Sequence, residues 1–350
     1  MATTFAVPDG RVAMAATTYT GTGTISQAVS NAVNTVSFQP DLVWVKARNA
    51  SASNSLYDSI RGTKKFLASN TSDAEIDFSP YGVTTFGSSG FTVGDISSGF
   101  YYCNGSGITY VGWNWKAGGT AVSNTAGTIT SSVSANTTAG FSVVTYTGTS
   151  ALGTVGHGLG AVPGLIITKT RTSTQYWAVY HSSLGRNSII YLNVNNGAAS
   201  SAGFWSSSDP TSAVFGVAGQ PANNEASIPL VAYCWAPVAG YSAFGSYTGN
   251  GSADGPFIYT GFLPRWVMTK RTDAGSTNSW YIKDTARSPS NVGMLQLFAD
   301  LPNAESSELG IDYVSNGFKV RGSNAGINAT GATYIYAAFA ENPLKYANAR

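Results

Sequence analysis

The chain has few charged residues. Asp, Glu, Lys and Arg make up 10% of its 350 residues, against about 25% in an average soluble protein. The formal net charge is +2 and the basic residues form no run or stripe, so the electrostatic footprint of a nucleic-acid-binding protein is missing. We therefore expect no nucleic-acid partner, and a polar surface built mostly from Ser, Thr, Asn and backbone groups.

Cysteine and histidine are scarce too, with two of each. Cys103 and Cys234 fall at non-equivalent places in the sequence repeats described below, which favours free buried thiols over a disulfide framework. These cysteines and the two histidines, His157 and His181, are widely scattered and show no zinc spacing. We expect neither a metal nor a cofactor.

A long apolar segment is also lacking. Residues 1–19 have neither the basic start nor the continuous apolar core of a secretory signal peptide. The longest apolar stretch, residues 230–244, is interrupted by Pro237 and Gly240 and is too short to span a bilayer. We expect synthesis in a reducing cytoplasm and no membrane insertion.

What the chain does contain is one pattern that occurs three times. Each copy begins with Tyr-Thr-Gly and reaches, after 21 residues in the first copy and 17 in the others, a Pro that opens an apolar run. A Lys follows that Pro by six residues every time. Equal spacing inside the run and unequal spacing before it are typical of a strand preceded by loops of variable length. The recurring lysines are Lys46, Lys169 and Lys270.

Each copy then continues with an aromatic segment and a polar turn, and it ends in a second strongly apolar strand. The residues that match between copies are Asp58, His181 and Asp284 in the turns, and Trp115, Trp235 and Phe339 near the end of the last strands.

Short runs of β-branched and aromatic residues, separated by Gly, Ser, Asn and Pro clusters, predict an all-β protein. We expect three tandem β-sandwich repeats of the jelly-roll or lectin-like type, with very little helix. Residues 90–93 and 317–320 are predicted as further strands, and residues 63–69 and 303–309 as the best candidates for a helical turn.

The predicted boundaries follow from these marks. They are an N-terminal arm at 1–16, repeats at 17–118, 141–240 and 241–343, a linker at 119–140 and a polar tail at 344–350. The Ser/Thr/Asn-rich linker could instead hold a strand, because Val122, Ile129 and Val133 alternate with polar residues.

The recurring lysines and the arginines beside them are the candidate binding residues: Lys46, Arg48, Lys169, Arg171, Lys270 and Arg271. Each Lys would project near the end of its strand, where its ammonium could bind a carboxylate or a sugar hydroxyl. The structural alternative is that its stem covers an aromatic ring while the ammonium stays in water. Asp58 with Arg61, and Asp284 with Arg287, are predicted as turn-stabilising ion pairs, worth about 0–1 kcal/mol if exposed.

Other motifs are weak. Residues 156–161 have the letters of a dinucleotide-binding fingerprint, but a β-rich run follows where that motif needs a helix, so we predict a turn. Asp73, Glu75 and Asp77 could bind calcium from one side of an extended segment, yet the Gly and distal Glu of a calcium loop are missing and a solvated edge is the alternative. His181 reads as a turn variant rather than a general base.

No catalytic residue is assigned, because several acidic residues could serve equally well as a glycosidase pair. They are Asp73, Glu75, Asp77, Glu305 and Glu308.

The third copy carries the most specific motifs. They lie at residues 247–251, 261–264, 270–273, 280, 284–289 and 338–343. In these the chain resembles the repeated domain of tailed-bacteriophage virion proteins, and residues 2–4, 38–44 and 110–118 resemble the first domain of such proteins. The second copy departs most, because it has His181 in place of Asp and lacks the Asp-Thr-Ala-Arg turn.

The resemblance implies a non-enzymatic structural protein of the virion, on the tail or the head surface. Our first hypothesis is a tail fibre or spike component that forms a homo-oligomer. Its expected partners are other virion proteins and a host-surface glycan. Capsid decoration, as a cement or head-fibre protein docked through residues 1–19, is an alternative, and a polysaccharide depolymerase is a second one. No catalytic residues are carried across by the resemblance.

Overall fold

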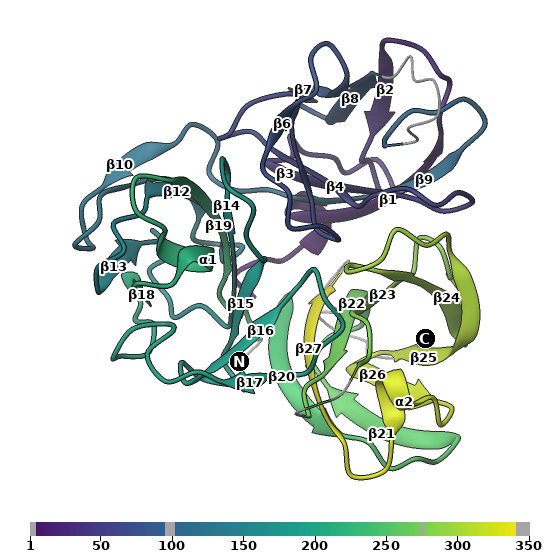
Figure 1. The fold of residues 1–350 in the computed structure, drawn as a ribbon. Helices are drawn as coiled ribbons and strands as arrows, with labels where there is room; N and C mark the ends of the chain where they lie inside the picture. Colours follow the sequence, from purple (N-terminus) through teal and green to yellow (C-terminus); the bar gives the residue numbers. More distant parts are fainter. Residues whose placement is uncertain (1–4, 95–101, 274, 276, 341–350) are drawn as a thin grey trace.

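The computed structural model describes residues 5–94, 102–273, 275 and 277–340. About 46% of the chain is in strands and 3% in helix, so the predicted all-β fold with very little helix is confirmed. Three lobes surround a common centre, and each lobe is built from one of the three sequence copies (Figure 1). Within the described residues, no helix is long and apolar enough to cross a membrane.

The first repeat is a sandwich of two sheets. Its elements are η1 (Gly10–Val12), β1 (Met14–Thr20), β2 (Gln27–Ser30), β3 (Leu42–Ala47), β4 (Ser55–Asp58), β5 (Lys65–Ala68), β6 (Ile76–Asp77), β7 (Gly82–Gly87), β8 (Gly90–Gly94) and β9 (Thr109–Trp115). The main sheet has the order β1-β9-β3-β4-β5-β6 and the smaller sheet has the order β2-β8-β7.

The second repeat reproduces this main sheet and enlarges it. Its elements are β10 (Val122–Asn124), β11 (Ser131–Asn136), β12 (Phe141–Thr147), β13 (Gly153–Gly156), β14 (Leu165–Thr170), β15 (Ala178–His181), β16 (Ser188–Tyr191), β17 (Ala199–Ser200), β18 (Val214–Val217), α1 (Pro221–Asn224) and β19 (Pro229–Trp235). The order β12-β19-β14-β15-β16-β17 matches the first repeat, and β10 and β11 add to the free edge of β12. The segment 119–140 therefore contains strands, the second of the two alternatives for it.

The third repeat closes further. Its elements are β20 (Ser242–Thr248), β21 (Asp254–Tyr259), β22 (Pro264–Arg271), β23 (Tyr281–Asp284), β24 (Gly293–Phe298), β25 (Ser306–Val314), β26 (Gly317–Arg321), α2 (Ala325–Asn328) and β27 (Thr333–Ala340). Its eight strands follow the order β20-β27-β22-β23-β24-β25-β26-β21, in which β24 joins the main sheet to the outer one.

The predicted strands at 90–93 and 317–320 are confirmed as β8 and β26. The two expected helical turns were wrong, since residues 63–69 contain β5 and residues 303–309 enter β25. Pairing with a neighbouring strand outweighs local helix preference there. Among the described residues, the two α-helices, α1 and α2, are single turns just before the last strand of their repeats.

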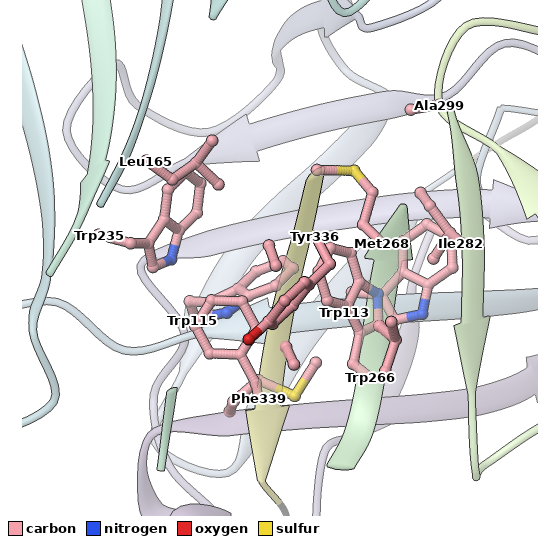
Figure 2. Packing of buried hydrophobic residues seen from close by; sticks show 14 of the residues in the cluster. Trp113, Trp115, Leu165, Trp235, Trp266, Met268, Ile282, Ala299, Tyr336 and Phe339 are labelled. Atoms are coloured by element: carbon pink, nitrogen blue, oxygen red, sulfur yellow. The ribbon is translucent and has the colours of Figure 1, made fainter. Parts of the chain in front are cut away.

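The main strands are apolar on both faces because both faces are buried. In β3, Val43 and Val45 pack inside their own repeat, whereas Leu42 and Trp44 belong to a core shared by all three repeats. This shared core lies where the three main sheets meet, and Figure 2 shows rings from β9, β19, β22 and β27 converging in it. The hydrophobic contacts that stabilise each repeat therefore continue into its neighbours.

The matched rings near the ends of the last strands meet at the centre of this core. Trp115 lies 5.9 Å from Trp235 and 5.6 Å from Phe339 between ring centroids, and Trp235 lies 6.5 Å from Phe339. Each of the three rings contacts the other two, so they form a triangle around the approximate threefold axis of the chain. The three residues that match in the sequence repeats are therefore also in contact in the structure.

The Tyr-Thr-Gly pattern is explained by one repeated contact. The hydroxyls of Tyr19, Tyr146 and Tyr247 donate to the backbone carbonyls of Cys103, Asn223 and Ile327, at 2.6, 2.5 and 2.9 Å. A Cβ added to the following glycine would approach a backbone carbonyl oxygen to 2.3 Å at Gly21, 2.1 Å at Gly148 and 2.3 Å at Gly249. Only glycine fits this approach, so the motif fastens the first strand of each repeat to the loop before the last strand.

The N-terminal segment belongs to the same compact unit. Val7 is buried in the shared core, β1 already begins at Met14, and the ring of Phe5 lies against Gly240 at the junction of the second and third repeats. Residues 5–16 therefore pack on the repeats in this structure.

Candidate functional site

The first candidate binding residue, Lys46, is completely buried at a boundary between repeats. Its Nζ donates to the carbonyl oxygen of Ala52 in its own repeat and to that of Pro302 in the third repeat, each at 2.8 Å. Strand β3 directs the side chain toward the boundary with the third repeat, where one carbonyl oxygen from each repeat replaces water around the ammonium.

The other two lysines make the same kind of contact. Lys169 is fully buried and donates to the carbonyl of Ser72 in the first repeat at 3.1 Å. Lys270 is fully buried and donates to the carbonyl of Asn195 in the second repeat at 2.8 Å, and to that of Asn278 in its own repeat. The lysine of each repeat therefore contacts the preceding repeat, and the lysine of the first repeat contacts the third. The three contacts together form a closed ring of repeats.

Burial has a clear electrostatic effect on these lysines. Desolvation lowers the pKa of Lys46 to about 7, and those of Lys169 and Lys270 to about 8, because a buried ammonium loses its hydration. The structural alternative, in which the ammonium groups remain in water, was wrong. A second repeat covers the end of each strand, which a single repeat could not have revealed.

Two of the candidate arginines reinforce two of the three boundaries. Arg48 forms a two-point ion pair with Glu305, at 3.1 and 2.8 Å. Arg171 forms the same pair with Glu75, at 3.0 and 2.8 Å. Both pairs join neighbouring repeats in the same direction as the lysines do.

At the boundary between the second and third repeats, both members of this ion pair are replaced by uncharged residues. The residue that follows Lys270 by two positions, as Arg48 follows Lys46, is Thr272, and the residue facing it is Ala198. The backbone hydrogen bond from Ala198 to Thr272 remains at 2.9 Å, like those from Glu305 to Arg48 and from Glu75 to Arg171. The sixth candidate, Arg271, instead pairs with Asp273 in its own repeat. Counting two residues from each lysine would have identified Thr272 from the sequence.

The predicted turn ion pairs are present but buried. Asp58 pairs with Arg61, and Asp284 pairs with Arg287, with all four side chains inaccessible to solvent. The same arginines bind Glu75 and Glu305 at 2.9 Å. Each glutamate therefore links the turn of its own repeat to an arginine of the next repeat.

The aspartates of these turns also accept a hydrogen bond from a neighbouring repeat. Tyr233 donates its hydroxyl to Asp58 at 2.7 Å, and Trp113 donates its indole N–H to Asp284 at 3.0 Å. The second repeat has His181 at this place, and its Nε2 lies 3.1 Å from the carbonyl oxygen of Tyr336. Burial lowers the pKa of His181 to about 4, so it is a neutral hydrogen-bonding group at a repeat boundary.

Sequence reasoning missed one further set of boundary residues. Asn54, Trp177 and Trp280 directly precede β4, β15 and β23. Their side-chain N–H groups donate to backbone carbonyls in the neighbouring repeat, at 3.0 Å to Phe298, 2.9 Å to Ala68 and 2.9 Å to Tyr191. Their common position, one residue before the start of the strand, could have identified them from the sequence. Asn54 hides this match because it does not resemble the two tryptophans chemically.

The other motifs considered in the sequence can be located in the structure. Residues 156–161 form the end of β13 and a loop that continues to β14, so the predicted turn is present. His157 is buried there, with Nε2 at 3.1 Å from the carbonyl of Thr211. Cys103 and Cys234 are free and buried. Glu75 is held by two arginines and Asp77 pairs with Lys65, and the described residues contain no group of three His, Cys, Asp or Glu arranged to hold a metal.

Three adjoining hollows lie on the second repeat and along its boundary with the first repeat. Their volumes are ≈ 470, 400 and 480 Å³. The first hollow shares Ser132 and Thr145 with the second, and Asp41 with the third. The floor is the hydroxyl-bearing face of β10, β11 and β12, since Ser123 pairs with Ser132 and Ser132 pairs with Thr145. The groove exists at this boundary because β10 and β11 extend the second sheet.

This groove offers hydroxyl groups and one largely buried carboxylate as hydrogen-bonding partners. The carboxylate of Asp41 accepts from the hydroxyl of Ser59 and from the backbone N–H of Ala117, each at 2.7 Å. Its pKa is raised by burial, and these hydrogen bonds oppose the rise. The groove can therefore bind polar groups through its hydroxyls and the carboxylate of Asp41.

The fold and these contacts define an all-β protein whose three sandwich repeats are joined into one closed unit by buried polar and aromatic contacts. Residues 12–343 match the family model described as a domain of unknown function, DUF7483. The chain belongs to this family, and the matched region includes all three repeats. No curated protein and no solved structure matches the chain.

Proposed function

We propose that the chain is a non-enzymatic structural protein of a tailed-phage particle, a component of the tail fibre or spike that contacts a glycan on the host surface. The observation that carries the proposal is the use of its recurring chemical groups. Lys46, Lys169 and Lys270 all bind backbone carbonyls across repeat boundaries. The lysines that first suggested a binding site therefore hold neighbouring repeats together, as a structural scaffold requires.

The resemblance of the third copy to virion proteins supplies the particle context of this proposal. A low content of charged residues, 10%, also suits a protein that works outside cells through many polar and aromatic contacts. The threefold contacts are already closed within one chain, so a homo-oligomer would have to form through the outer surfaces of the ring. Light scattering of the purified chain measures this oligomeric state directly.

Imaging of labelled particles tests the location. An antibody fragment against the chain should appear at the tail when purified particles are examined by electron microscopy. Labelling spread over the shell would support capsid decoration instead. Absence of the chain from purified particles, measured by mass spectrometry, would overturn both assignments. Release of reducing ends from a host polysaccharide by the purified chain would replace them with the depolymerase.

A further inference from the structure

Two aromatic rings on the outer sheet of the third repeat point away from any core. Phe257 and Tyr259 on β21 are 48% and 67% exposed, whereas Ile258 between them is 5% exposed. Alternate residues of a strand face opposite sides, so both rings project from the outer face of the sheet. Burial of the rings does not explain their presence.

The two sister repeats show that the fold does not require rings at these positions. Ile258 pairs with Phe318, as Val29 pairs with Phe91 and Val155 pairs with Phe215. This register places Ala28 and Ser30 in the first repeat, and Thr154 and Gly156 in the second, at the positions of Phe257 and Tyr259. In the first repeat this place is a hollow of ≈ 210 Å³. The same architecture thus forms with small residues.

The surroundings of the rings carry balanced charges. Lys319 stands opposite Phe257 in the strand register. Asp254 pairs with Lys319 and with Arg321, each at 2.9 Å, and Arg321 also pairs with Asp312 at 2.6 Å. Two cations and two anions cancel. The face therefore offers both donors and acceptors beside the rings without attracting a polyanion or an anionic membrane.

The exposed apolar area is small. A Phe or Tyr side chain has roughly 150–250 Å² of surface, so two half-exposed rings present about 200 Å². A stable protein interface buries about 800 Å² on each partner. The rings are therefore too limited an apolar surface for a second copy of the chain, and they suit a ligand with small apolar patches.

An uncharged sugar chain combines the required properties. One face of a pyranose ring carries C–H bonds, which pack on the negative face of an aromatic ring, and its hydroxyls both donate and accept hydrogen bonds. A Cβ at Gly317 would lie 3.0 Å from Cε2 of Phe257, so the ring of Phe257 lies over this glycine and is supported from beneath. Glycine leaves the ring lying low on the sheet, where a flat ligand can reach it.

We propose that the outer face of β21, β26 and β25 binds an uncharged carbohydrate chain, with Phe257 and Tyr259 as the stacking platform and Lys319, Arg321, Asp254 and Asp312 as the hydrogen-bonding groups. This proposal rests on the glycan contact proposed above and assigns it to the third repeat. The groove between the first and second repeats has hydroxyls but lacks an exposed aromatic ring among its lining residues.

Calorimetric titration of the full chain with maltohexaose, cellohexaose, chitohexaose and mannohexaose tests the proposal. At least one of these neutral oligosaccharides should bind in the millimolar range or tighter. The double variant Phe257→Ala, Tyr259→Ala should weaken that binding about tenfold or more, a loss of ~1.4 kcal/mol. Tyr259→Trp should retain it. The matched control is Tyr176→Ala, which removes from the second repeat a ring as exposed as that of Phe257, 48%.

Three outcomes would overturn the proposal. They are failure of the wild-type chain to bind any of the four probes, equal binding by the double variant, and a concentration-dependent dimer in sedimentation that the double variant loses. The rings are exposed, so the double variant should unfold at the same denaturant concentration as the wild type, and misfolding is detected separately. Presence of the chain in purified particles is measured independently, so loss of sugar binding leaves the virion assignment intact.

Discussion

The indole rings of Trp115 and Trp235 meet edge to face with their centroids 5.9 Å apart, although 120 positions of sequence separate them. Phe339 contacts both rings from the third repeat. A repeat that lost either neighbour would expose its ring and the apolar face around it. The three repeats are therefore expected to unfold together.

Trp115→Ala should lower the free energy of unfolding by about 3–5 kcal/mol, because it removes a large ring from a core that cannot collapse around the cavity. Denaturant unfolding followed by circular dichroism measures the change. Tyr176→Ala is the control, since that ring is half exposed, and it should stay within about 0.5 kcal/mol of the wild type. Separate transitions for the three repeats in the wild-type chain would contradict a shared core.

The buried lysines predict a dependence of stability on pH. Burial lowers the pKa of Lys46 to about 7, whereas an unfolded lysine has a pKa of about 10.4. Between these values the unfolded state binds more protons than the folded state, so the free energy of unfolding should rise as pH increases from about 7 to about 10. Lys169 and Lys270, with pKa values of about 8, contribute in the same direction.

The triple variant Lys46→Met, Lys169→Met, Lys270→Met should reduce this rise, and Lys283, whose pKa burial also lowers to about 7, supplies the remainder. The variant also loses stability because it leaves carbonyl groups without donors. Unfolding midpoints at a series of pH values for both proteins provide the comparison. A wild-type curve that runs parallel to the variant curve would show that the carbonyl oxygens keep the lysines charged. The control Lys116→Met removes an exposed lysine and should leave the slope unchanged.

The third repeat boundary can be given the ion pair that the other two possess. Ala198→Glu together with Thr272→Arg should place a carboxylate opposite a guanidinium, as in Glu305 with Arg48. A double-mutant cycle of unfolding free energies should give a favourable coupling of about 0.5–1 kcal/mol. The coupling should weaken in high salt because the pair is partly exposed. Additive effects of the two single variants would show that the third boundary has a different geometry.

The reverse experiment tests the existing network. Arg61→Met should cost about 3–5 kcal/mol, because it leaves the buried carboxylate of Asp58 without its cation. Arg186→Met removes an arginine whose side chain is 33% exposed and whose carboxylate partner, Asp209, lies at 3.9 Å, and it should have little effect. Unfolding curves of both variants at neutral pH measure the loss of stability. Equal free energies of unfolding for the two variants would argue against a structural role for the buried pair.

Both cysteines should be unreactive in the folded chain. Cys103 and Cys234 are 1% and 0% exposed, and burial raises the pKa of the Cys234 thiol. A thiol reagent should therefore modify them only after unfolding. Two free thiols in denaturant and almost none in buffer are the expected result. Rapid modification in buffer would mean that the repeats open on the timescale of the reaction.

Much of the architecture could be predicted from the sequence because it depends on local pattern. The strand positions and the alignment of Trp115 with Trp235 and Phe339 follow from period and spacing. The one-turn elements were misplaced, because helical preference over so few residues is weaker than pairing in a sheet. The candidate lysines were identified correctly as recurring, but their environment was not.

The sequence by itself determined that the chain is all-β, that it contains one unit three times, and that Lys46, Lys169 and Lys270 have equivalent roles. Only the tertiary structure decided what those roles are. Each lysine is buried by a loop from another repeat, and that loop lies at least 75 positions away in the sequence. Spacing within one repeat reports which residues share a strand, but burial depends on what covers that strand, and in this protein the cover always comes from a neighbouring repeat.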